Sequence, residues 1–171
     1  MNFKIQFAMG SYFGQPQIKV VIDDYMLLYD GTAQELLEFD VQLDDGNHEL
    51  KIVHHGKTVD DHLLDNHGNI IQDKFVEIKK IWMEGVELES ELWSGRFFPV
   101  YMHKAEHEPY FISPNLYLGH NGTWILNFST PALTWLINLR NQGPNLDGTI
   151  FKTSRQTLQE MKQIFLDLPD V

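Results

Sequence analysis

Residues 57–75 (KTVDDHLLDNHGNIIQDKF) concentrate oxygen-bearing side chains in one short stretch of the chain. Four aspartates, two asparagines and two histidines occupy these nineteen positions. Calcium prefers roughly six to eight oxygen ligands from carboxylates, amides and backbone carbonyls. Carboxylates this close together repel one another unless a cation or full solvation compensates. The stretch therefore predicts either a cation site or a solvated turn, and the candidate ligands are Asp60, Asp61, Asp65, Asn69 and Asp73.

The spacing of these residues does not match an EF-hand. That motif requires acidic or amide side chains at loop positions 1, 3 and 5, glycine at 6 and glutamate at 12. Counting from Asp61 places Leu63, Asp65, Asn66 and Gln72 at positions 3, 5, 6 and 12. A calcium site here would have to be of another type.

Histidines offer a competing set of metal ligands. Zinc sites need three or four converging ligands, for which imidazole and carboxylate are suitable. No fixed spacing in this stretch enforces such convergence, so we favour calcium over zinc as the predicted cofactor. The histidines in question are His54, His55, His62 and His67.

Motifs for catalysis are scarce in the chain. It contains no cysteine, no G-x-S-x-G nucleophile elbow and no glycine-rich phosphate loop. The paired carboxylates of a glycoside hydrolase stay open as an alternative, because the chain has 24 acidic residues. We therefore expect a binding or assembly protein and not an enzyme.

The net charge argues against several partners. Lys and Arg number 13 against 24 Asp and Glu, a formal net charge of −11. Such a field disfavours nucleic acid and anionic membrane surfaces. The chain has no apolar run of about 18 residues for crossing a membrane. Its start, MNFKIQFAMGSYFG, is not expected to be a secretion signal.

Alternating apolar residues in the first hundred positions predict short β-strands. Residues 36–43 alternate most clearly and precede the turn-forming sequence DDGN (44–47), after which residues 48–55 resume the alternation. We expect 36–43 and 48–55 to form a hairpin. The residues predicted to face the core are Phe3, Ile5, Phe7, Ile18, Val20, Ile22, Leu37, Phe39, Val41, Leu43, Leu50 and Ile52.

Further strands are predicted after the acidic stretch. Residues 75–83 alternate with a slip that predicts a β-bulge at Lys79–Lys80. Residues 86–92 and 123–128 alternate again, the latter with Trp124, Leu126 and Phe128 on one face. Several short strands at roughly ten-residue spacing predict a mostly β fold, an antiparallel β-sandwich of jelly-roll type.

The last third of the chain has a different pattern. Residues 94–120 are predicted as long loops, and Thr130 with Pro131 is typical of the start of a helix ending near Gly143. Residues 154–168 predict an amphipathic helix, a C-terminal helical appendage. We expect 1–92 to form the sandwich core, and 93–171 either to complete the same domain or to form an assembly arm.

Aromatic residues without a core periodicity predict a surface for binding partners. Tyrosine and phenylalanine in loops anchor protein interfaces when they are exposed. The candidates are Tyr101, Tyr110, Phe111 and Tyr117, together with Phe165 of the C-terminal helix.

Three segments resemble the calcium-dependent jelly-roll carbohydrate-binding modules of families 36 and 60. They are GNHELKIVH (46–54), DNHGNIIQDKFVEI (65–78) and IWMEGVEL (81–88). The resemblance implies that Asp65, Asn69 and Asp73 lie near the calcium ligands of that family, with Asp60 and Asp61 on its preceding acidic pair. In that family the calcium contacts sugar hydroxyls. The chain departs from the pattern by inserting HLL before Asp65 and by placing a lysine at position 74.

Two runs resemble small virion-associated proteins of tailed phages, especially marine ones. They are HELKIVHHGKTVDD with the segment that follows, and NGTWILNFSTPALTWL (121–136). The two resemblances together imply a non-catalytic virion structural protein with a calcium-stabilised, carbohydrate-binding-like sandwich. The expected location is the virion. The expected partners are other virion subunits, with which the protein would be oligomeric, or surface glycans. The first alternative is a free calcium-dependent carbohydrate-binding module, and the second is a glycoside-directed hydrolase.

Overall fold

The computed structural model of the chain describes residues 1–100, 111–112, 114–142, 145–146 and 149–150. The chain divides into two compact units, Met1–Ala132 and Leu133–Val171. The predicted helix 154–168 lies outside the described residues, and so do the predicted partner-binding residues Tyr101, Tyr110 and Phe165. No helix among the described residues is both long enough and apolar enough to cross a bilayer.

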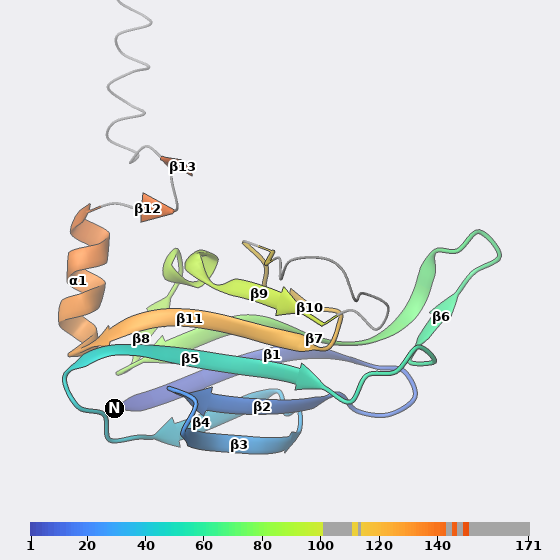
Figure 1. Cartoon of the computed structure of the whole chain (residues 1–171), viewed down its shortest axis with the longest axis horizontal. Helices are drawn as coiled ribbons and strands as arrows, with labels where there is room; N and C mark the ends of the chain where they lie inside the picture. The colour runs from blue at the N-terminus through green and yellow to red at the C-terminus, as the bar shows by residue number, and fades with distance from the viewer. Residues whose placement is uncertain (101–110, 113, 143–144, 147–148, 151–171) are drawn as a thin grey trace, which may run out of the picture. The chain divides into compact units, whose positions relative to one another are not determined.

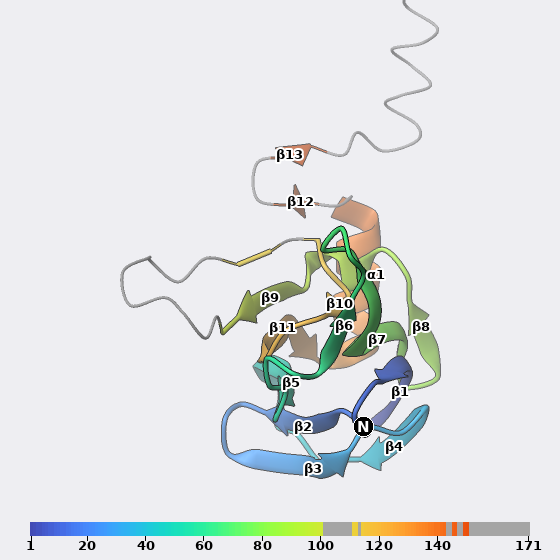
Figure 2. The ribbon, with the colours of Figure 1, turned by 90° about the vertical axis from the view of Figure 1, so that its right-hand side faces the viewer.

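The first unit contains two antiparallel sheets that pack against each other as a β-sandwich (Figures 1 and 2). The first sheet has the order β10-β7-β1-β4, and two short strands, β6 and β8, also pair with β7. Its strands are β1 (Asn2–Ser11), β4 (Leu36–Asp40), β6 (His62–Leu64), β7 (Ile70–Met83), β8 (Val86–Leu88) and β10 (Tyr117–Leu118).

The second sheet has the order β3-β2-β5-β11-β9. A short 3-10 helix, η1 (Glu91–Ser94), precedes β9. Its strands are β2 (Gln17–Ile22), β3 (Met26–Thr32), β5 (Gly46–His55), β9 (Arg96–Pro99) and β11 (Gly122–Thr130). Strands β9 and β11 pair within this sheet, so residues 96–99 and 122–130 belong to the same sandwich. The predicted fold class, a mostly β antiparallel sandwich, is confirmed.

The core lies between the inner faces of the two sheets, where the alternating residues meet. Phe3 of the first sheet contacts Phe128 of the second edge to face, with ring centroids 5.6 Å apart. The apolar faces predicted for β1, β2, β5 and β11 are confirmed. The fully buried members are Phe3, Ile5, Ile18, Val20, Ile22, Leu50, Ile52, Trp124 and Leu126, each with 0% of its surface exposed.

Strands β4 and β5 correct one prediction. The segments 36–43 and 48–55 do not form a hairpin, because β4 pairs with β1 in the first sheet and β5 pairs with β2 and β11 in the second. Residues 41–45 instead carry the chain from one sheet to the other. Leu37 is buried as predicted, whereas Val41 and Leu43 lie outside the strand and are half-buried.

Strand β7 begins earlier than predicted and contains the predicted bulge. Its first residue is Ile70, so the acidic stretch is largely a β-hairpin of β6 and β7, not a loop. In Figure 1 this hairpin extends beyond the end of the sandwich. Gln6 pairs with Lys80 and Phe7 with Ile78, which leaves Lys79 unpaired and confirms the bulge at Lys79–Lys80.

Helix α1 (Ala132–Gln142) begins at the last residue of the first unit, and its other residues belong to the second unit. The second unit also contains two short paired strands, β12 (Asn145–Leu146) and β13 (Thr149–Ile150). The helix predicted to end near Gly143 is therefore confirmed. The prediction that Thr130 and Pro131 begin this helix is wrong, because Thr130 belongs to β11 and α1 begins at Ala132. The Thr130 hydroxyl accepts a hydrogen bond from the backbone N–H of Gly46.

Candidate binding groove

The β6–β7 hairpin positions the predicted calcium ligands, and Asp61 lies on its core-facing side. The carboxylate of Asp61 accepts hydrogen bonds from Lys74 Nζ at 2.7 Å and from the backbone N–H of Thr58 at 2.7 Å. The side chains of Lys74 and Asp61 are only 10% and 6% exposed. Burial alone would raise the pKa of the Asp61 carboxyl, but these bonds outweigh it and hold that pKa below its ordinary value.

Asp73 lies on the opposite side of the hairpin. Successive residues of a strand point to opposite faces, so the side chains of Asp73 and Lys74 diverge. Lys57 Nζ forms a short ion pair with Asp73 Oδ1 and also donates to the carbonyl of Gly119 at 2.5 Å. The hydroxyl of Tyr117 donates to Asp73 Oδ2 at 3.2 Å.

The other predicted ligands lie in and before the hairpin turn. Asp65 accepts bonds from the backbone N–H groups of His67 and Asn69, both at 2.8 Å, and from the Asn69 amide at 2.9 Å. These bonds, from the Asn69 side chain first, hold the pKa of Asp65 below its ordinary value. Asp60 is exposed. Among the residues that the structure describes, no three His, Cys, Asp or Glu side chains gather closely enough to hold a metal ion.

The five predicted ligands therefore do not converge on one point in the described structure. Asp65 and Asn69 bond each other, whereas Asp61 and Asp73 face opposite sides of the hairpin and each pairs with a lysine. This arrangement does not fit a single calcium ion held by all five. Calcium binding itself stays a prediction.

A groove of about 810 Å³ lies beside the hairpin, and Asp73 forms part of its wall. Three parts of the chain that are distant in sequence contribute to it: the stretch 57–73, Phe97 with Val100, and lining residues between Ile112 and Asn121. Its polar side chains are Lys57, Thr58, His62, Asp73, Asn115, Tyr117, His120 and Asn121, and its apolar ones include Val59, Leu64, Ile70 and Ile112.

Tyr117 supplies the aromatic surface of the groove. Its ring stacks on Phe75, with centroids 4.8 Å apart and an interplanar angle of 35°. Phe75 in turn lies directly over Gly10, where a Cβ atom would come within 2.4 Å of the ring. Burial and the nearby charge of Asp73 raise the pKa of Tyr117 to about 12, so its hydroxyl stays protonated and donates to that carboxylate.

Asn121 and His120 form the part of the groove that precedes β11. Asn121 fixes Lys57 by two bonds, accepting from its backbone N–H at 2.9 Å and donating to its carbonyl at 2.7 Å. Burial and the charge of Lys57 lower the pKa of His120. His54 lies next to this segment with its side chain wholly buried, and its Nδ1 donates to the His120 carbonyl at 3.0 Å. Asn121 therefore holds the backbone of Lys57, while Asp73 and the Gly119 carbonyl hold its ammonium group.

Of the predicted partner-binding residues, Phe111 and Tyr117 lie within the described structure. They are 44% and 43% exposed. Tyr117 lines the groove, whereas Phe111 packs beside Phe98 and lies 5.0 Å from the guanidinium of Arg96. Sequence reasoning missed Lys57, His120 and Asn121 as groove residues, because no local pattern links positions 57 and 120. The one signal was a lysine at each end of the acidic stretch.

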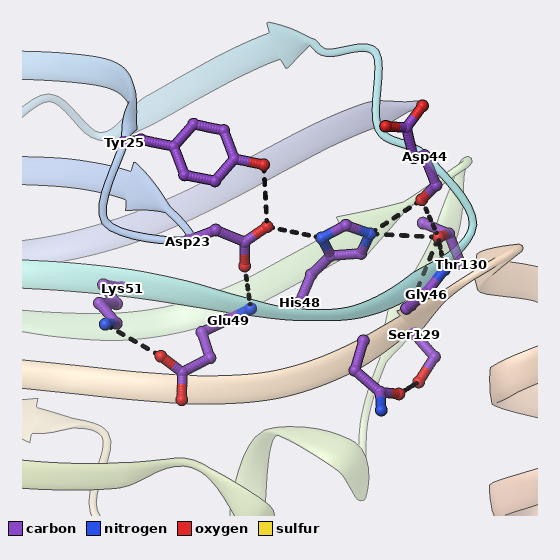
Figure 3. A network of polar contacts seen from close by, with 10 residues as sticks. Asp23, Tyr25, Asp44, Gly46, His48, Glu49, Lys51, Ser129 and Thr130 are labelled. Carbon is purple, nitrogen blue, oxygen red and sulfur yellow. Dashed lines mark hydrogen bonds and ion pairs between the residues drawn. The ribbon is translucent and has the colours of Figure 1, made fainter.

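A second polar network lies away from the groove and has the residue types of a catalytic triad (Figure 3). His48 Nδ1 is 2.6 Å from Asp23 Oδ2, and its Nε2 is 3.2 Å from Thr130 Oγ1. However, Nε2 is also 2.9 Å from the carbonyl oxygen of Asp44, which can only accept, so Nε2 must be a donor. It has no lone pair left to take a proton from Thr130. The network therefore joins the turn between β2 and β3, the segment 41–45 and the end of β11, and does not activate a nucleophile.

Comparisons with known proteins gave one structural likeness. No protein-family model and no curated protein sequence matches the chain. A solved structure titled "vCBM60 in complex with galactobiose" is 13% identical with a TM-score of 0.44, covering 75% of this chain and 98% of that chain. That structure is of a carbohydrate-binding module. Nothing in the comparisons concerns phages or virions.

Proposed function

We propose that the protein is a non-catalytic carbohydrate-binding module and that its groove binds the sugar. The observation that carries the proposal is the layer formed by Gly10, Phe75 and Tyr117 next to the buried Lys57–Asp73 pair. Sugar rings present an apolar face that stacks on aromatic rings, and hydroxyls that both donate and accept hydrogen bonds. A rigid aromatic ring beside fixed polar groups suits both features.

The size of the groove agrees with a small saccharide. Pockets for small ligands have volumes of roughly 300–1,000 Å³, and this groove, at about 810 Å³, lies within that range. Lys57 has three N–H donors, of which two are used by Asp73 and Gly119. The third donor and the imidazole of His62 provide hydrogen-bonding capacity for sugar hydroxyls.

The carboxylates of the groove favour binding over hydrolysis. Glycoside hydrolysis uses a pair of carboxyl groups that flank the scissile bond. Of the described residues that line the groove, Asp73 alone carries a carboxylate, and both of its oxygens accept bonds from Lys57 and Tyr117. Assembly with other virion subunits and a location in a virion stay predictions.

A glycan array followed by calorimetric titration of its hits tests the proposal. We expect a hit whose affinity falls about 5- to 30-fold in Tyr117→Ala, because stacking on an aromatic face contributes on the order of 1–2 kcal/mol. Tyr25→Ala is the matched control, since Tyr25 is 74% exposed and does not line the groove. Equal affinities of the two variants, or an array without hits in the presence and absence of calcium, would contradict the proposal.

A further inference from the structure

We infer that Lys57 and Lys74 are the built-in counter-ions of the acidic stretch 57–75 and take the place of the predicted divalent cation. The fold and its groove wall then need no metal ion. The inference follows from where the two ammonium groups lie and concerns stability, so it stands independently of what the groove binds.

The first counter-ion, Lys74, neutralises Asp61 on the core-facing side of the hairpin. The two residues are opposite each other where the chain enters β6, and the backbone N–H of Lys74 also donates to the Asp61 carbonyl at 3.0 Å. Asp61 Oδ1 contacts the ammonium and Oδ2 accepts from Thr58, so both oxygens have a donor. A calcium ion at this carboxylate would compete with a lysine whose side chain is 10% exposed.

The second counter-ion, Lys57, neutralises Asp73 on the groove side. Asp73 Oδ1 contacts the ammonium and Oδ2 accepts from Tyr117, so each oxygen of this carboxylate also has a donor. The lysine is held at its backbone by Asn121 and at its Nζ by the Gly119 carbonyl. Its side chain is 10% exposed and that of Asp73 is 8% exposed. The pair thus joins the hairpin to the segment before β11, a joining role that a bound cation could otherwise have.

Two separate counter-ions are needed because one ion cannot reach both carboxylates. Asp73 and Lys74 are consecutive in β7, so their side chains point to opposite faces. Asp61 lies on the same side as Lys74, with which it pairs. With the two lysines counted, the stretch retains two unpaired aspartates, Asp60 and Asp65. Asp65 is satisfied by its own turn, and Asp60 is exposed to water. The repulsion that predicted a cation is therefore already relieved.

Thermal unfolding of the full chain in chelator, in millimolar magnesium and in millimolar calcium tests the inference. We expect the wild-type Tm to be the same in all three buffers. Lys57→Met and Lys74→Met should each lower Tm by on the order of 10 °C in every buffer, because each leaves a buried carboxylate unpaired. Lys79→Met is the matched control, since Lys79 is on the same strand, is 46% exposed and should change Tm by about 1 °C.

Three results would overturn the inference. One is a calcium-specific rise of the wild-type Tm that disappears in Asp61→Asn or Asp73→Asn. Another is a loss in Lys57→Met and Lys74→Met no larger than in Lys79→Met. The third concerns a Lys74→Met variant that does not fold. The double variant Asp61→Leu/Lys74→Met also removes the unpaired carboxylate and should then fold. If neither the single nor the double variant folds, Lys74 acts through packing and not as a counter-ion.

Discussion

Replacing Trp124 with alanine is expected to lower the free energy of unfolding by about 3–5 kcal/mol, the range for large aromatic residues in a core. Trp124 is wholly buried near the start of β11, the strand between β5 and β9. Its ring lies so close to Gly95 that a Cβ atom there would come within 2.2 Å of it. Truncation would leave a cavity at a point where both sheet neighbours and the 3-10 helix meet, and the backbone there has little room to collapse.

Two matched variants separate the parts of this effect, measured by chemical denaturation. Trp93→Ala is the control for residue type and should cost well under 1 kcal/mol, because Trp93 is 48% exposed. Trp124→Phe should cost less than Trp124→Ala, since the indole N–H that it removes has no acceptor among the described residues. A loss of stability in Trp93→Ala equal to that in Trp124→Ala would show that the core is not centred on β11.

The sequence allowed the inner faces of the strands to be predicted because one face of each strand is buried. Phe3, Ile5 and Ile18 alternate with polar residues, and a one-residue slip would move all of them to solvent. The same reasoning located the bulge at Lys79, where the alternation slips by one residue. These properties are local, so local patterns were sufficient to predict them.

Strand pairing is not local, which is why the hairpin of 36–43 and 48–55 was wrong. The sequence DDGN correctly indicates a change of direction, but it does not specify whether the next strand joins the same sheet. Here the segment is held instead by Thr130, whose hydroxyl donates to the Asp44 carbonyl at 2.5 Å and accepts from the Gly46 N–H at 2.9 Å. Thr130 is distant in sequence, so no pattern around residue 45 could reveal it.

The candidate site shows the same division between local and distant contacts. The acidic residues were found because they are adjacent in sequence, and the turn at Asp65 and Asn69 is a local feature. Their lysine partners were missed, since the Asp61–Lys74 contact requires the register of the β6–β7 hairpin and the Lys57–Asp73 contact requires the segment at 119–121. Ligand type alone therefore predicted a metal ion at carboxylates of which two also pair with ammonium groups, and calcium binding stays a prediction.

Removing His48 is expected to cost about 2 kcal/mol at pH 6 and much less at pH 9, since it makes charge-assisted hydrogen bonds. Burial alone would lower the pKa of His48, but its bonds to Asp23 and to the Asp44 carbonyl outweigh burial and raise it. A raised pKa in the folded state means that the contribution is complete below about pH 6.5 and is lost as pH rises through the folded value. The pKa of Asp23 is lowered against the effect of burial, chiefly by the bond to His48, so its contribution disappears only in acid.

His54, six residues further along β5, is expected to have the opposite pH dependence. Burial lowers its pKa, and the charge of Lys57 lowers it further against the bond to the His120 carbonyl. Protonation is therefore easier in the unfolded chain, and the free energy of unfolding should fall as pH decreases below about 6.5. The two histidines together predict maximum stability near neutral pH.

Chemical denaturation of the wild type, His48→Gln and His54→Asn between pH 5 and pH 9 separates the two contributions. His48→Gln should remove the decline on the alkaline side and keep the decline in acid, whereas His54→Asn should do the reverse. Asp23→Asn is the matched control for the first variant, because it removes the same charge pair from the other side and should flatten the same limb. A cost of His48→Gln that is equal at pH 6 and pH 9 would mean that protonation of the imidazole adds no stability, and it would contradict the charge-assisted bond to Asp23.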